Sequence, residues 1–281
     1  MSYAKRNWPS KLREYQQKEK LLGDRGSYSK TDTDATFMRM KEDHMKNGQL
    51  KPAYNLQIST ENQFILNYTI HQKPTDYATL APHIEQFEQL LGKVPDELCA
   101  DAGYGSEENY EYIQSKQIEG YVKFNYFHKE QSKKWREDPF TLRNLFYNTE
   151  QDAYYCSMGQ KMSNIGTYIR KTSTGFKQNI TRYKAERCKG CPLRGKCHKQ
   201  KGNRVIEVNH NLNNHKDIMR SRLTSEKGLK HRSNRPAEVE AVFGHIKHNR
   251  NFKRFMLKGI DKVEIEAGLV AMAHNIKKMA T

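Results

Sequence analysis

Long apolar runs are missing from this sequence of 281 residues. No stretch approaches the roughly 20 consecutive apolar residues that a membrane-spanning helix needs, so a membrane protein is excluded. The N-terminal segment MSYAKRNWPSKLREYQQ is charged but lacks the apolar core of a secretory signal, which leaves the cytoplasm as the expected location.

Acidic residues are also few. Asp and Glu number 32 against 49 Lys and Arg, a formal net charge of +17 with His neutral. A surface this basic repels itself unless a polyanion is bound, and the commonest polyanion of the cytoplasm is nucleic acid. On charge alone, a soluble lysine-rich protein without such a partner is the alternative.

The five cysteines do not make a disulfide framework in a cytoplasmic chain, so they are buried apolar residues or metal ligands. Cys188, Cys191 and Cys197 follow the C-x2-C-x5-C spacing of a metal-binding knuckle. A tetrahedral zinc site needs a fourth ligand, for which Cys156 is the first candidate and His198 the substitute. We therefore predict a structural Zn²⁺; the alternative is three reduced cysteines in a tight loop.

Composition divides the chain into four regions. Residues 1–50 are polar and are interpreted as a lead-in, the remnant of an upstream region. Residues 51–148 and the helical residues 206–281 are predicted to be two halves of one α/β domain. Residues 149–205 lie between them as a basic, cysteine-rich insert with weak helical periodicity.

The first half alternates strand and helix signals. YNLQIST and FILNYTIHQ predict an antiparallel hairpin, and the apolar positions from Ala78 to Leu91 predict a helix that ends at Gly92. Two more strands are predicted at 97–101 and 118–126. Cys99 lies in the first of these, where we expect it to pack rather than to bind metal.

Asp101 stands at the carboxyl end of a predicted strand and is followed by Gly103 and Gly105. Ligands bind at this edge of α/β sheets, and glycine lets the backbone approach a bulky partner closely. A strand-ending Asp is also a common helix cap, and that is the alternative role.

A second candidate pair lies on the predicted helix 234–249. Glu240 and Lys247 are seven residues apart and therefore lie on nearly the same helix face. Such a carboxylate can ligate a divalent ion, and the lysine can bind a phosphate group. The alternative is a solvated Glu and Lys at the edge of an apolar stripe.

Five stretches of the sequence, in order, belong together: LKPAYNLQISTENQFILNYTI with PTDYATLAPHI, ADAGYGSEENYEYI, CKGCPLRGKC, EVEAVFGHIKHNRNFKRF and VEIEAGLVAMAHNIKK. Together they resemble the bacterial insertion-sequence transposases of the DDE type, from about residue 24 to the C-terminus. The resemblance implies an α/β fold with an RNase H-like mixed sheet flanked by helices. It also implies an enzyme that cuts and rejoins DNA ends.

In that family three carboxylates hold two divalent ions, Mg²⁺ or Mn²⁺. By resemblance Asp101 matches the second carboxylate and Glu240 the third, while Lys247 matches the lysine of an E-x6-K element. The arginine that usually precedes the glutamate would fall at Pro236, so Arg235 lies one place off.

The first carboxylate belongs on a first strand that this sequence does not show. Asp32 and Asp34 lie in a turn-rich loop and Glu61 in a β-turn, which makes each a poor substitute. We therefore expect a C-terminal portion of a transposase that lacks the first, central strand. Such a chain should be marginally folded and should have no strand-transfer activity by itself.

Basic residues cluster from Arg182 to Arg204 and from Lys216 to Lys258, and Lys247, Arg235 and Arg250 are expected to contact DNA. The expected partners are double-stranded DNA and the ends of the element, with a homodimer left open. No helix-turn-helix signature is evident. A non-catalytic nucleic-acid-binding zinc protein, an inactive transposase relic and a nuclease of the same fold are the alternatives.

Overall fold

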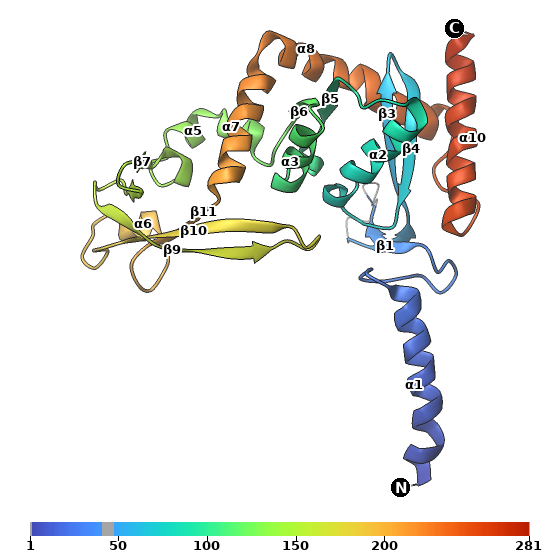
Figure 1. Cartoon of the computed structure of the whole chain (residues 1–281), viewed down its shortest axis with the longest axis horizontal. Coiled ribbons are helices and arrows are strands. Elements are labelled where there is room, and N and C mark those ends of the chain that lie inside the picture. The colour runs from blue at the N-terminus through green and yellow to red at the C-terminus, as the bar shows by residue number, and fades with distance from the viewer. Residues whose placement is uncertain (1, 41–47, 281) are drawn as a thin grey trace. The chain divides into compact units, whose positions relative to one another are not determined.

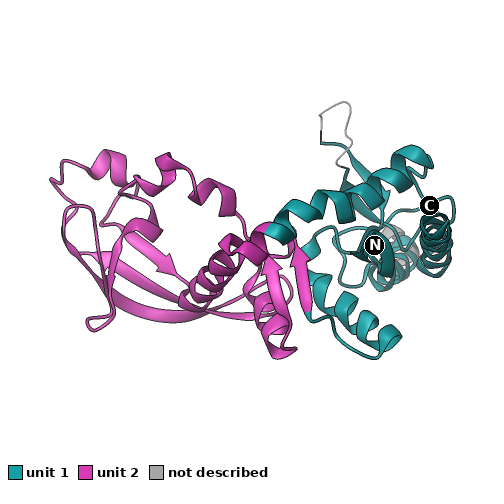
Figure 2. Cartoon of the chain, turned by 90° about the horizontal axis from the view of Figure 1, so that it is seen from above, with its two compact units in different colours: residues 1–96, 230–281 teal, residues 97–229 magenta. Residues whose placement is uncertain are grey.

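The computed structural model describes residues 2–40 and 48–280. The chain is a mixed α/β protein, as the sequence predicts, and divides into two compact units. Unit 1 comprises residues 1–96 and 230–281, and unit 2 comprises residues 97–229 (Figure 2). None of the helices in the described part of the chain combines the length and apolar character needed to cross a membrane.

Unit 1 joins strands from the first hundred residues to helices from the C-terminal end (Figure 1). Its strands are β1 (Thr36–Arg39), β2 (Leu50–Ala53), β3 (Asn55–Glu61) and β4 (Phe64–His71). Its helices are α1 (Ser2–Leu22), α2 (Leu80–Leu91), α9 (Ala241–Gly244) and α10 (Ile260–Met279), and α8 (Glu226–Arg235) enters it from unit 2.

The predicted hairpin is strands β3 and β4, paired antiparallel from Asn55 opposite His71 to Glu61 opposite Phe64. Asn62 and Gln63 turn the chain with positive φ angles of 51° and 65°, as a two-residue type I′ turn requires. The predicted helix is α2, which ends at Gly92 in the left-handed conformation (φ 72°).

The core of unit 1 lies between the hairpin and the C-terminal helices. Ile65 of β4 packs with Val242, Ile246 and Ala271, all at most 8% exposed. Asn275 of α10 fixes this packing, because its side chain accepts from the Ile65 N–H (2.9 Å) and donates to the Ile65 carbonyl (2.8 Å). The apolar faces of the C-terminal helical residues therefore cover the hairpin.

Strands β1 and β2 pair antiparallel, although no strand was expected before residue 50. Each has four residues, which is too short for an alternating pattern to stand out. In β1, Thr36 and Met38 are buried while Phe37 and Arg39 are exposed, so the alternation exists but spans only two pairs.

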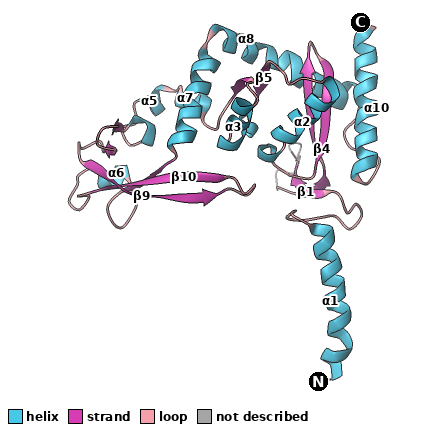
Figure 3. Cartoon of the chain, in the orientation of Figure 1, coloured by secondary structure: helices cyan, strands magenta, loops and turns pink. Residues whose placement is uncertain are grey.

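Unit 2 contains one parallel strand pair and one larger antiparallel sheet (Figure 3). Its strands are β5 (Glu97–Ala100), β6 (Glu119–Val122), β7 (Phe146–Asn148), β8 (Ala153–Tyr155), β9 (Lys161–Lys171), β10 (Lys177–Ala185) and β11 (Val205–Val208). Its helices are α3 (Glu107–Ser115), α4 (Phe127–Glu130), α5 (Lys133–Arg136), α6 (Arg194–Cys197) and α7 (His210–Thr224).

β5 and β6 are the two strands predicted at 97–101 and 118–126, and they run parallel with Ala100 opposite Val122. Helix α3 connects them, and Tyr110 and Ile113 of that helix are 1% and 2% exposed. A parallel pair joined by a helix is the βαβ arrangement that the alternating pattern predicts.

The region predicted as a cysteine-rich basic insert forms, with its flanking residues, a five-stranded antiparallel sheet in the order β11-β10-β9-β8-β7. Met162, Tyr183 and Val208 form its core and are at most 1% exposed. The Tyr183 hydroxyl lies 2.6 Å from Asp152 and 2.8 Å from Nε2 of His210. Tyr183 therefore packs inside the protein and does not present its ring to a nucleic acid.

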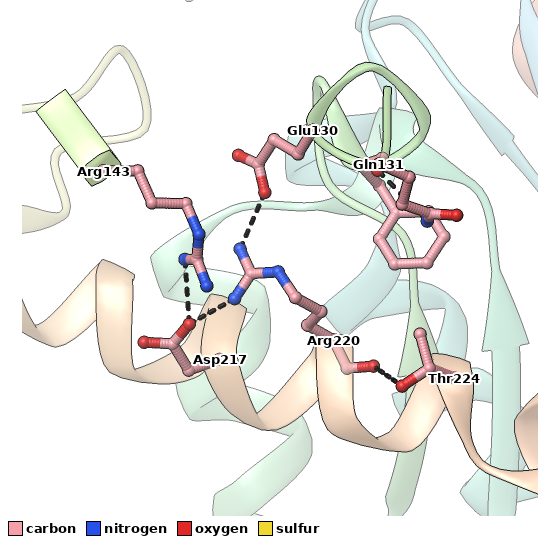
Figure 4. A network of polar contacts seen from close by, with 7 residues as sticks. Glu130, Gln131, Arg143, Asp217, Arg220 and Thr224 are labelled. Atoms are coloured by element: carbon pink, nitrogen blue, oxygen red, sulfur yellow. Dashed lines mark hydrogen bonds and ion pairs between the residues drawn. The ribbon is translucent and has the colours of Figure 1, made fainter. Parts of the chain in front are cut away.

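Charged side chains join helix α7 to the segments before the antiparallel sheet (Figure 4). Arg220 binds Glu130 of α4 at 2.7 Å and also contacts Asp217 one turn earlier. Asp217 in turn accepts from Arg143 at 2.9 Å. Part of the basic cluster predicted to contact DNA is thus neutralised inside unit 2.

Glu107 is a buried carboxylate that no sequence pattern singles out. It is 3% exposed at the first turn of α3 and accepts hydrogen bonds from three amides: Gln178 of β10 (2.9 Å), Asn209 before α7 (2.5 Å) and Asn211 (2.9 Å). It thereby ties α3 to the antiparallel sheet and to α7.

Replacing Glu107 by Ala should lower the free energy of unfolding of unit 2 by roughly 3 kcal/mol, because three amide donors lose their acceptor. Urea unfolding followed by circular dichroism measures this loss. Glu108→Ala is the matched control: Glu108 accepts from the exposed Thr174 hydroxyl, and its loss should cost below about 1 kcal/mol. Equal losses in the two variants would contradict the role assigned to Glu107.

Candidate functional site

Asp101 follows β5 and belongs to unit 2. Its Oδ1 accepts a hydrogen bond from the Gly103 N–H at 2.9 Å, so it caps the short 3₁₀ turn Ala102–Tyr104. The helix-cap role is therefore real. It is compatible with metal binding, because a carboxylate has two oxygens and about four acceptor positions.

Gly105 packs closely against the backbone that follows β6, and this contact, in place of the predicted bound partner, explains the need for glycine. A Cβ at this position would lie 2.4 Å from the Lys123 carbonyl oxygen and 2.9 Å from Cα of Phe124. The backbone after β6 is also bonded to β5, since the Lys123 N–H donates to the Ala100 carbonyl at 3.3 Å. The glycine holds Asp101 in place by letting these two strand ends meet.

Glu240 belongs to unit 1 and lies at the end of a π-helical segment, Pro236–Glu240. Its side chain is 59% exposed and accepts from Nη1 of Arg235 at 2.8 Å. In a π-helix the hydrogen bonds run from residue i to i+5, so residues five apart stack on one face. The local geometry therefore pairs Arg235 with Glu240 although strict motif spacing places the arginine at Pro236.

Neighbouring residues anchor this segment to the β3–β4 turn. Glu238 accepts from the Gln63 N–H at 2.8 Å, and Nε2 of Gln63 donates to the Ala237 carbonyl at 2.9 Å. Glu238 therefore has a structural partner, while Glu240, two residues on, faces solvent beside an arginine.

Lys247 and Arg250 lie further along the same helical stretch. Lys247 is exposed in a second π-helical segment, His245–Asn249, with its ammonium 5.7 Å from the Phe243 ring centroid. Arg250 donates from Nη2 to the Ala273 carbonyl at 2.9 Å, so it links this stretch to α10. Two π-helical segments break the uniform 100° per residue on which the predicted alignment of Glu240 with Lys247 rests.

Asp32, Asp34 and Glu61, the three alternatives for the first carboxylate, do not lie on a strand next to Asp101 in the described sheets. Asp32 accepts from the Tyr54 hydroxyl (2.8 Å) and from the Gly259 N–H (3.2 Å), and Asp34 accepts from the Ile260 N–H (3.0 Å). Both therefore cap the N-terminus of α10, where negative charge is stabilised. Glu61 is exposed at the end of β3.

All four predicted zinc ligands line one small cavity of unit 2: Cys156, Cys188, Cys191 and Cys197. Two tight turns bring the cysteines to this cavity. In the first, the Cys191 N–H donates to the Cys188 carbonyl; in the second, the Gly159 N–H donates to the Cys156 carbonyl. The knuckle and the turn after β8 thus meet at one place.

Arg204 faces two of these sulfurs. Its backbone N–H donates to Sγ of Cys188 at 3.3 Å, and its Nη1 donates to Sγ of Cys197 at 3.1 Å. Hydrogen-bond donors and positive charge around sulfur are the surroundings that a thiolate needs, and thiolate is the form that binds metal. No sequence pattern marks Arg204 for this role.

His198 suits the fourth position less well than Cys156. Burial, together with the charges of Arg194 and Arg204, lowers the pKa of His198, which favours the neutral ring. Nδ1 accepts from the Gln200 N–H at 3.2 Å, which puts the proton on Nε2. Nε2 is buried without a hydrogen-bond partner, yet in this tautomer it has no lone pair for a metal.

Within residues 2–40 and 48–280, no three His, Cys, Asp or Glu side chains are close enough together to hold a metal ion. The cysteines share a cavity but are not arranged as a finished tetrahedral site. Their donor chemistry fits Zn²⁺, because four thiols suit a closed structural site.

The hairpin of β9 and β10 presents a basic surface, of which the predicted basic cluster from Arg182 to Arg204 covers only the end. Residues 161–185 contain six Lys and Arg and no Asp or Glu. Lys171 and Lys177 lie opposite one another and are exposed, as are Ile169 and its partner Asn179. The absence of any carboxylate over 25 residues is the signal that could have revealed this surface.

One known family matches the chain. Residues 155–280 match the family model described as "Transposase DDE domain". This segment contains the four predicted zinc ligands as well as Glu240 and Lys247. Asp101 lies before the matched segment. No curated protein and no solved structure matches the chain.

Proposed function

We propose that this chain acts in DNA transposition, because its residues 155–280 match the DDE domain of transposases. The reaction would cut and rejoin the ends of a mobile element in double-stranded DNA, as in bacterial insertion sequences, in the cytoplasm at the nucleoid. The observation that carries the proposal is the family match across the segment that holds Glu240 and Lys247.

DDE transposase domains use divalent metal ions, and Asp101 and Glu240 are the residues that we propose to hold Mg²⁺ or Mn²⁺. Carboxylate oxygens are the ligands these hard ions prefer. Two such ions, if held there, would supply activation of the attacking oxygen and neutralisation of charge on the leaving oxygen. Both side chains suit this role, since Glu240 is exposed and the Gly103 N–H orients Oδ1 of Asp101.

Arg235 acts in this proposal as a positioning residue for Glu240. Its side chain is 18% exposed and its guanidinium binds the carboxylate at 2.8 Å, which favours one orientation of the carboxylate. Lys247 would bind a DNA phosphate, because it is exposed and presents a flexible point charge.

We further propose that the first carboxylate lies on another strand, beyond the elements described here. Asp32 and Asp34 are committed to the N-terminus of α10. In the described residues, β3–β4 and β5–β6 are two-stranded sheets. By resemblance an RNase H-like fold has a first strand that carries this carboxylate.

DNA cleavage assays test the function and the missing carboxylate separately. Radiolabelled element ends are incubated with Mg²⁺ or Mn²⁺ and either the 281-residue chain or a form extended by the residues encoded upstream of Met1. We expect strand cleavage and joining from the extended form only. Cleavage by the 281-residue chain would contradict the proposal that its first carboxylate is missing. Absence of cleavage with both forms would contradict the proposed transposase activity.

A structural Zn²⁺ at Cys156, Cys188, Cys191 and Cys197 is the second metal that we propose. Its support is the shared cavity and the donors that Arg204 directs at two sulfurs. Closed thiolate sites support folding and not chemistry, so this ion would stabilise the antiparallel sheet.

The outward face of the β9–β10 hairpin is the DNA-contacting surface that we propose in unit 2. Two-stranded ribbons fit the DNA grooves, and uncompensated lysines bind phosphates. Replacing both Lys171 and Lys177 by Glu should weaken duplex binding at least about tenfold and reduce the slope of log affinity against log salt by about 2.

Filter binding or fluorescence anisotropy at several salt concentrations measures this effect. The control is the double variant Lys93→Glu and Lys133→Glu, which changes the net charge equally at exposed positions outside the hairpin. Equal weakening in both double variants would show a general charge effect and contradict a specific DNA surface on the hairpin.

A further inference from the structure

Helix α10 carries an apolar stripe on its solvent-facing side. Five large side chains lie alternately four and three positions apart and are 59–78% exposed: Ile265, Leu269, Met272, Ile276 and Met279. Exposed apolar side chains in such a continuous row mark an interaction surface more often than scattered ones do.

The opposite side of α10 is buried against the rest of unit 1. Val263, Ala267, Ala271 and His274 are buried, and this side covers β4 (Figure 1). At 100° per residue, the centre of the exposed stripe lies about 160° from Ala267. The exposed stripe therefore takes no part in the packing of α10 within unit 1.

The spacing of the stripe indicates what covers it. Apolar residues that repeat at intervals of four and three have a period of 3.5, which is the pattern of a coiled-coil seam and not of a single helix on a sheet. The occupant that fits is another helix with the same spacing, and α10 of a second copy is such a helix.

Charge favours an antiparallel arrangement of two copies. Residues 260–270 carry a net charge of −2, from Asp261, Glu264 and Glu266 against Lys262, and residues 271–279 carry +2, from Lys277 and Lys278. Parallel helices would place like charges together, whereas antiparallel helices place opposite charges together.

We propose that two copies of this chain associate through the outer faces of their α10 helices, as an antiparallel helix pair. Met272 is the midpoint of the stripe, so it would meet Met272 of the partner subunit at the two-fold axis. Ile265 would meet the partner's Met279, and Leu269 the partner's Ile276. The pairing involves unit 1 alone and needs neither DNA nor a bound metal.

Cysteine cross-linking tests the proposal and its direction. In the full chain, Met272→Cys should give a covalent dimer with a short bismaleimide reagent, and Ile265→Cys should cross-link efficiently to Met279→Cys but not to itself. The parent chain, with its own five cysteines, is the control. Failure of Met272→Cys to cross-link above the parent, or self-linking of Ile265→Cys, would overturn the antiparallel pair.

Sedimentation or light scattering gives the second measurement. Leu269→Glu should raise the dimer dissociation constant at least about tenfold, because an unpaired charge would be buried at the seam. Leu90→Glu is the matched control, since Leu90 is 61% exposed on α2 of the same unit. A monomeric parent at about 100 μM, or an unchanged Leu269→Glu variant, would overturn the interface.

Discussion

Metal-dependent DNA cleavage should fall at least about 1,000-fold when Asp101 is replaced by Asn, because the amide cannot hold a divalent ion as a carboxylate does. Asn can still accept the Gly103 hydrogen bond, so the turn after β5 should survive. Asp96→Asn is the matched control: it removes an exposed carboxylate at the other end of β5.

Glu240→Gln should lower cleavage by a similar factor. Its control is Glu238→Gln, two residues away, where the amide oxygen can still accept from Gln63. Cleavage is measured with the form of the protein that cuts element ends, and circular dichroism shows whether each variant folds. Full activity in Asp101→Asn or Glu240→Gln would remove that residue from the metal-binding set.

The second large effect concerns the cysteine cavity. Cys188→Ser should eliminate bound zinc and lower the free energy of unfolding of unit 2 by at least about 3 kcal/mol, because Cys188 is buried beside Arg204 and the metal would bind only the folded state. Elemental analysis after purification under reducing conditions and unfolding with and without a chelator measure the two quantities.

Cys99→Ala provides the control for this experiment. Cys99 lies on β5, outside the cavity, so the variant should retain one zinc per chain. Absence of zinc from the parent protein, or equal zinc in Cys188→Ser and the parent, would contradict the zinc site.

The sequence predicted elements well where apolar periodicity was strong. The hairpin β3–β4, helix α2 and the parallel strands β5 and β6 all have clear patterns and were found. Strand β9 was missed because residues 164–171 are exposed on both faces, so apolar and polar residues do not alternate along it. Strands β7 and β8, with three residues each, are too short to show a pattern.

The candidate site was predicted unevenly for similar reasons. The cysteine spacing predicted Cys156 as a fourth zinc ligand, and Cys156 lines the same cavity as the knuckle, while the zinc site itself stays a prediction. The pairing of Arg235 with Glu240 could not be predicted, because it depends on a π-helical segment and the usual spacing assumes a uniform α-helix. Glu107 and Arg204 act through contacts with residues distant in sequence, which no local pattern encodes.

Iron-mediated cleavage of the polypeptide is the most direct test of the proposed metal ligands, because Fe²⁺ substituted for Mg²⁺ generates radicals that cut the backbone near the ion. If Asp101 and Glu240 both bind divalent ions, we expect cuts near each of them. The cut near Asp101 should be lost in Asp101→Asn and the cut near Glu240 in Glu240→Gln, with Asp96→Asn unaffected. Absence of a cut near either residue, or a cut that persists in the matching variant, would contradict the role of that residue.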